Sequence, residues 1–155
     1  MSAVALPLTG RCHCGATSYE VSQRRVVTYA CHCRNCQRIS GSAFALSVIV
    51  REESLVITGP VKRTNWVAES GNSRWGDFCA DCGSRIAHGT EPSIGMLVVR
   101  AGTLDDPSWF QPTAHIWTSE AQPWFMFADD EVRFEGQPQD TAPLIERFAR
   151  LGLFS

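Results

Sequence analysis

Seven cysteines in three short groups constrain the fold of this 155-residue chain more than any other feature. The groups read CHCG at 12–15, CHCRNC at 31–36 and CADCG at 79–83. Seven is an odd number, which fits a disulfide framework poorly, and clustered cysteines in a reducing compartment are typical of metal binding or catalysis. We therefore expect these thiols to bind metal, and a set of disulfides is the alternative.

Two of the groups end in a cysteine followed by glycine, at Cys14-Gly15 and Cys82-Gly83. Glycine permits a left-handed backbone, and the N–H groups of such a turn can point at sulfur. Because zinc binds four thiolates as a tetrahedron, we combine the two glycine-closed groups into one structural site that joins the N-terminal part of the chain to its middle. This site consists of Cys12, Cys14, Cys79 and Cys82.

The middle group then keeps three thiols, Cys31, Cys33 and Cys36, and no further cysteine. Three protein ligands beside an open position is the coordination expected of catalytic zinc. Three alternatives stay open. The first pair could bind together with Cys31 and Cys33 and leave Cys36 with the third group. His32 or a distant histidine could complete a structural site. Finally, the thiols could remain free of metal.

Three thiolates would leave a zinc ion with a net charge near −1, so the site would be a weak Lewis acid but a soft acceptor for sulfur. An incoming thiol would lose its proton there, and we expect chemistry at the sulfur of a substrate. Arg34 and Arg38 could offset the negative charge or hold a substrate carboxylate, or could be solvated helix residues. The five tryptophans could line a pocket, although core packing is the interpretation we favour.

Three of the four histidines could bear on this chemistry. His13 and His32 each stand between two cysteines, so we expect their side chains at the surface rather than on a metal. His115 could act as a general base or as an occasional fourth ligand. A hydrogen-bonded core histidine is the alternative interpretation of His115, and the one we favour.

Short apolar or alternating runs separated by turn residues predict an all-β, β-rich single domain over 1–155. The expected strands lie within 16–23, 25–30, 43–50, 54–59, 61–68, 74–80, 84–89, 95–102 and 113–118. A short helix is expected at 33–40 and a C-terminal helix at about 142–151. Leu144, Ile145, Phe148 and Leu151 share a face of the latter helix, which we expect to pack on the sheet, with a partner protein's groove as the alternative.

The composition of the chain argues against two classes of function, nucleic-acid binding and membrane insertion. The formal net charge is −2, without the basic surplus of a nucleic-acid-binding protein. No apolar run reaches the roughly 20 residues of a membrane span, and the first ten residues do not read as a secretory signal. We expect a cytoplasmic protein with no nucleic-acid or membrane partner, and a homo-oligomer stays open.

Four segments together resemble the GFA family, whose members are similar to glutathione-dependent formaldehyde-activating enzyme. They are GRCHCGATSYEV, CHCRNCQRISGSAF, FCADCGSRI and VVRAGTLDDPSWFQPTAHIW, and the resemblance runs over about 10–127. It implies zinc-stabilised sheets of the type shared with a GTPase nucleotide-exchange chaperone. It also implies a structural zinc at Cys12, Cys14, Cys79 and Cys82 and a second zinc at Cys31, Cys33 and Cys36.

The same resemblance implies a carbon–sulfur lyase that joins glutathione to formaldehyde as S-hydroxymethylglutathione, or splits that adduct. We therefore expect a zinc-dependent enzyme acting on a small thiol and an aldehyde, with two zinc ions per chain and the second site in some molecules empty. The alternative function is a non-catalytic, zinc-stabilised protein-binding module.

Overall fold

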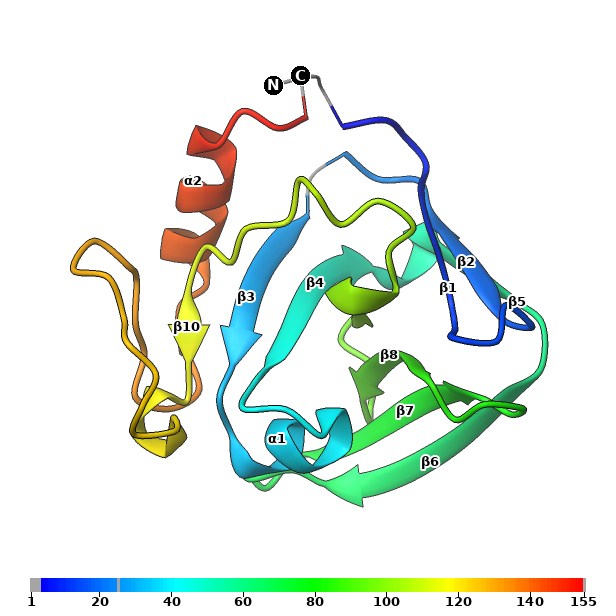
Figure 1. Cartoon of the computed structure of the whole chain (residues 1–155), viewed down its shortest axis with the longest axis horizontal. Coiled ribbons are helices and arrows are strands. Elements are labelled where there is room, and N and C mark those ends of the chain that lie inside the picture. The colour runs from blue at the N-terminus through cyan, green and yellow to red at the C-terminus, as the bar shows by residue number, and fades with distance from the viewer. Residues whose placement is uncertain (1–3, 25, 155) are drawn as a thin grey trace.

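The computed structural model describes residues 4–24 and 26–154. In this part of the chain ten strands form two sheets, as Figure 1 shows. The smaller sheet is antiparallel in the order β1 (Leu8–Arg11), β2 (Ser18–Val21) and β5 (Leu55–Thr58). The larger sheet has the order β10-β3-β4-β9-β8-β7-β6, and only its β10–β3 pair is parallel among the described strands.

The strands of the larger sheet, in that order, are β10 (His115–Ile116), β3 (Val27–Cys31), β4 (Ala45–Arg51), β9 (Met96–Arg100), β8 (Arg85–Thr90), β7 (Ser73–Cys79) and β6 (Val61–Val67). Three short 3-10 turns lie at Glu52–Ser54, Ala101–Thr103 and Thr118–Glu120. The two α-helices are α1 (Arg34–Ser40) and α2 (Ala142–Arg150).

The two faces of the larger sheet carry two apolar clusters, because side chains alternate along each strand. The larger cluster joins both sheets and includes Val21 of β2 with Val48 and Val50 of β4. The smaller cluster includes Tyr29 and Cys31 of β3, and it also takes in Cys33, Ala114, Ile116 and Leu144. Part of the cysteine group at 31–36 is therefore core.

The β-rich fold class predicted from the sequence is confirmed, and each predicted strand segment overlaps a strand. Strand β1 was not predicted. The Gly59-Pro60 turn carries the chain from β5 in the smaller sheet to β6 in the larger one. Gly59 has φ +107°, and a Cβ there would lie 2.1 Å from the carbonyl oxygen of Ala16, so this crossing requires glycine.

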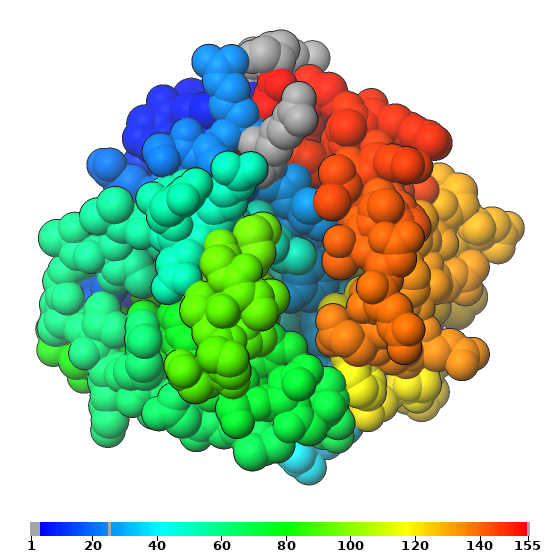
Figure 2. All heavy atoms as spheres, turned by 180° about the vertical axis from the view of Figure 1, so that it is seen from behind, coloured from blue at the N-terminus to red at the C-terminus, as the bar shows by residue number. Residues whose placement is uncertain are grey.

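Helix α2 ends one residue before the predicted boundary and contacts β3. Leu144 and Phe148 are buried as predicted, but the expectation that Ile145 shares their face is wrong, since Ile145 is 52% exposed. Successive helical residues are about 100° apart, so Leu144 and Phe148 form a narrow stripe and Ile145 falls at its edge. Ile145 lines a hollow of about 710 Å³ beside α2, visible in Figure 2 between red-orange and green segments.

Within the described ranges, neither helix has the length and apolar character needed to cross a bilayer.

Replacing Leu144 by alanine should destabilise the protein much more than replacing Ile145 by alanine. Leu144 is 2% exposed, so its truncation leaves a cavity that costs about 2–5 kcal/mol. The same change at Ile145 should cost below about 1 kcal/mol, because half of that side chain is already in water. Urea unfolding of both zinc-loaded variants measures the difference, and equal losses would contradict the packing described for α2.

Candidate metal centres

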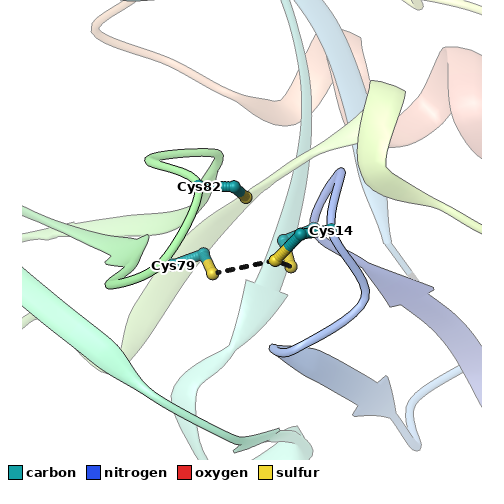
Figure 3. Close-up of side chains that lie close together, drawn as sticks. Cys14, Cys79 and Cys82 are labelled. Carbon is teal, nitrogen blue, oxygen red and sulfur yellow. Dashed lines mark hydrogen bonds between the residues drawn. The ribbon is translucent and has the colours of Figure 1, made fainter.

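The first cysteine cluster lies where turns from the two sheets meet. The four sulfurs of Cys12, Cys14, Cys79 and Cys82 all lie within 4.8 Å of one another. Cys14 Sγ is 3.5 Å from Cys12 Sγ and 3.8 Å from Cys79 Sγ. Figure 3 shows Cys14 on one turn facing Cys79 and Cys82 on the other. An ion held here would connect the turn after β1 to the turn after β7, and so connect the two sheets.

Glycine shapes both of these turns. Gly15 has φ +82° and Gly83 has φ +77°, so both adopt the left-handed backbone expected from the sequence. Gly15 N–H donates to the Cys12 carbonyl at 3.2 Å, and Gly83 N–H donates to the Cys79 carbonyl at 2.9 Å. In addition, Thr17 N–H donates to Cys12 Sγ at 3.3 Å. A backbone donor to sulfur of this kind stabilises a thiolate.

The second cluster is made by Cys31, Cys33 and Cys36, whose sulfurs also lie within 4.8 Å of one another. Cys31 ends β3, Cys33 caps the N-terminus of α1, and Cys36 lies in the first turn of that helix. Cys31 and Cys33 are buried and Cys36 is half-buried. Among the described residues, no fourth Cys, His, Asp or Glu joins this group.

The cysteines are thus divided as four plus three, and the alternative that joins Cys12 and Cys14 to Cys31 and Cys33 does not match the geometry. All seven cysteines are free thiols. In both clusters, the choice of ligand atoms fits a cation that prefers sulfur, such as zinc.

The hydrogen bonds among the three thiols of the second cluster are also consistent with a site for a cation. Hydrogen bonds from Cys31 and Cys33 lower the pKa of Cys36, and the charge of Arg100 acts in the same direction. Hydrogen bonds with Cys33 and Cys36 raise the pKa of Cys31, which acts as a donor. Without a cation the trio therefore shares protons around one thiolate, because three adjacent thiolates would repel one another. A bound divalent ion allows all three to ionise.

His32 is fully buried, so the expectation that it lies at the surface is wrong. The backbone N–H of His32 donates to the Ile116 carbonyl at 3.0 Å, which extends the β3–β10 pairing one residue beyond the end of β3. Its ring lies 5.0 Å from that of Phe125 and 5.4 Å from that of Phe127, in an aromatic cluster. The aromatic segment at 124–127 is the sequence signal that could have indicated this environment. His13, by contrast, is exposed as expected.

His115 is buried on β10, and its two ring nitrogens face other side chains. Nδ1 lies 2.9 Å from Nε2 of His32, and Nε2 lies 3.4 Å from Oε1 of Glu131. Burial lowers the pKa of His115. This environment is that of a hydrogen-bonded core histidine, and neither nitrogen points to a cysteine sulfur.

A polar row of the larger sheet lies beside the trio. Tyr29 of β3 pairs with Ser47 of β4, and Ser47 pairs with Arg100 of β9. The guanidinium of Arg100 donates to Ser47 Oγ at 3.2 Å and to Cys36 Sγ at 4.0 Å. Arg100 was not singled out from the sequence. It stands two positions after Val98, so in a strand the two side chains lie on the same face of the sheet.

The two arginines that were considered from the sequence lie elsewhere. Arg34 and Arg38 are exposed on α1 and line a surface hollow of about 340 Å³. Arg34 donates to Gln37 Oε1 at 2.5 Å. No cysteine of the trio lines this hollow. Of the tryptophans, Trp75 and Trp109 are core residues, as favoured, whereas Trp124 is 66% exposed.

Comparisons with known proteins agree with this geometry. A family model described as "Glutathione-dependent formaldehyde-activating enzyme" matches residues 7–120. A Penicillium rubens protein named "Putative glutathione-dependent formaldehyde-activating enzyme" is 30% identical over 108 residues. The match spans 66% of this chain and 56% of that relative, so the chain covers little more than half of its length.

A crystal structure of a Rhodobacter sphaeroides protein superposes with a TM-score of 0.50 at 20% identity. The superposition covers 82% of this chain and 99% of the other, and it supports the fold alone. The family model, by contrast, matches well over half of the sequence and includes all seven cysteines. The chain therefore belongs to the glutathione-dependent formaldehyde-activating enzyme family.

Proposed function

We propose that this chain is a zinc-dependent carbon–sulfur lyase that joins a small thiol to an aldehyde or splits their adduct. The observation that carries the proposal is the trio of Cys31, Cys33 and Cys36, which presents three sulfurs without a fourth ligand among the described residues. A structural site would use all of its positions for protein ligands, whereas three ligands leave one for a substrate. Membership of the family supports glutathione as the thiol and formaldehyde as the aldehyde.

The two clusters would have different roles. Cys12, Cys14, Cys79 and Cys82 would hold a structural zinc between the sheets, because four sulfurs complete a tetrahedron. The trio would hold the catalytic ion. Seven free thiols suit a reducing compartment, and we propose the cytoplasm.

Zinc at the trio would supply a soft acceptor for the substrate sulfur and lower the pKa of the substrate thiol. The residues of the chain set the conditions for this chemistry. Arg100 contacts Cys36 Sγ and offsets negative charge on the trio. Cys36 is half-buried while its two partners are buried, so substrate would approach from the side of Cys36.

The proposed reaction needs neither an oxidant nor a reductant. In the direction of synthesis the S–H bond of the thiol breaks and an S–C bond forms to the aldehyde carbon. The thiol proton ends on the former carbonyl oxygen, which becomes a hydroxyl group. The reverse reaction breaks the S–C bond and returns the proton to sulfur. The burial of the trio limits access of water to the reacting sulfur.

Replacing Cys36 by serine should abolish turnover while the protein stays folded. Loss of a residue that only orients a ligand typically costs 10–100-fold, so loss of a ligand should cost about 100-fold or more. The variant should hold one zinc per chain in place of two. Adduct formation from glutathione and ¹³C-formaldehyde, followed by NMR, measures turnover, and mass spectrometry measures zinc.

Cys82→Ser is the matched control, since it removes one thiol from the other cluster. It should destabilise the fold by a large part of the roughly 5–15 kcal/mol available to a domain. If Cys36→Ser keeps full turnover, the trio is not the active site. If the zinc-loaded wild type shows no turnover of small thiols and aldehydes, the binding-module alternative is favoured.

A zinc chelator should remove activity before it unfolds the protein. The trio offers three ligands and a half-buried sulfur, whereas the other site offers four ligands and contributes folding energy. Titration with a chelator, monitored by turnover and by circular dichroism, should give two separated transitions. Added zinc should restore activity after the first transition. Activity that persists in metal-free protein would exclude a zinc-dependent reaction.

A further inference from the structure

Two buried arginines near the trio lack a carboxylate partner. Arg85 and Arg100 are each 8% exposed, and neither forms an ion pair with an Asp or Glu among the described residues. Arg63 shows the usual arrangement in the same sheet, because it donates two hydrogen bonds to Asp77 at 2.7 and 2.8 Å. A buried charge without compensation is costly, so an anion is expected beside Arg85 and Arg100.

The trio compensates for one of these charges. Arg100 donates to Cys36 Sγ, and its other nitrogen donates to Ser47 Oγ. Three thiolates around a divalent ion carry a net charge of about −1, which one arginine balances. Arg85 then remains as a surplus positive charge. Burial, followed by the positive charge of Arg100, lowers the pKa of Arg85 to about 9, while the charges of Cys36, Tyr29 and Cys33 act in the opposite direction and place Arg85 within electrostatic reach of the trio.

Arg85 and His88 both carry a buried nitrogen that has no hydrogen-bond partner, Nε of Arg85 and Nδ1 of His88. Both residues contact the ring of Trp66. The Arg85 guanidinium lies 4.8 Å from the centroid of that ring, and the His88 ring lies 6.4 Å from it. The two unpartnered nitrogens therefore belong to side chains that lie against the same Trp66 ring.

His88 adds a neutral donor beside the Trp66 ring. Burial, together with the charges of Arg85, Arg100 and Arg74, lowers the pKa of His88 well below its usual value. A neutral imidazole can carry its proton on Nδ1 and donate from there. A guanidinium beside an N–H donor matches the two oxygens of a carboxylate.

We propose that Arg85, with Arg100 and His88 beside it, binds a carboxylate of the thiol substrate next to the three-cysteine site. This inference rests on the proposed function and narrows its substrates to small thiols that carry a carboxylate. It also moves carboxylate recognition away from Arg34 and Arg38, which are exposed on α1. Arg85 would act by holding the substrate rather than by taking part in bond formation.

The test compares two thiols of the same size, 3-mercaptopropionate and 3-mercaptopropionamide, by calorimetric titration of the zinc-loaded full chain. The wild type should bind the carboxylate about 10–100-fold more tightly, the range for hydrogen bonds to a charged group. Arg85→Gln should remove this preference by weakening binding of the carboxylate much more than binding of the amide. Arg150→Gln, which removes an exposed charge from α2, should preserve the preference.

Each outcome separates this inference from the proposed function. If neither thiol binds, the proposed function fails and the inference fails with it. If the wild type binds both thiols equally, only the inference is overturned. It is also overturned if Arg38→Gln, rather than Arg85→Gln, removes the preference. Should Arg85→Gln lose zinc or unfold, His88→Ala takes its place and is expected to reduce the preference about 3–10-fold.

Discussion

Crowding of thiols is the constraint on which the rest of this structure depends. Two clusters hold their sulfurs within 4.8 Å, a spacing at which neighbouring thiolates repel one another unless they share protons or a cation. One cluster lies at the junction of the two sheets, and the other lies where β3 passes into α1. Both clusters could meet this constraint in the same way, by binding a cation through sulfur, with four ligands at one cluster and three at the other.

Charge balance explains why the surroundings of the two clusters differ. Backbone donors such as Thr17 N–H approach the four-cysteine cluster, which lies near the surface at Cys14. Two of the three cysteines of the trio are buried, and so is Arg100 beside them. Arg100 reaches Cys36 directly, while Arg85 lies against Trp66. If the trio holds a divalent ion, Arg100 would balance its net charge, and Arg85 would be left for the substrate carboxylate that we propose.

Most of the fold, and the division of the cysteines into two groups, could be predicted from local patterns in the sequence. Strands were predictable because alternation is a local property, and the four-plus-three grouping was predictable because glycine after Cys14 and Cys82 indicates the same turn. Burial of charged and polar residues was not predictable. A β-bulge between Asp77 and Phe78 changes the phase of β7 against β8, so the direction of Arg85 depends on pairing between distant strands. The burial of His32 was missed for a similar reason, because two of the aromatic rings that pack on it, Phe125 and Phe127, lie about 90 residues further along the chain.

The two cysteine clusters differ in how far apart their residues lie along the chain, and this has a consequence for biosynthesis. The trio spans only residues 31–36, so its three ligands emerge from the ribosome together and can meet an ion while most of the polypeptide is still missing. The other site joins Cys12 to Cys82 and cannot close until the later residue has been made. A nascent chain therefore presents its complete three-sulfur group before the residues that join its two sheets at the other cluster have been made.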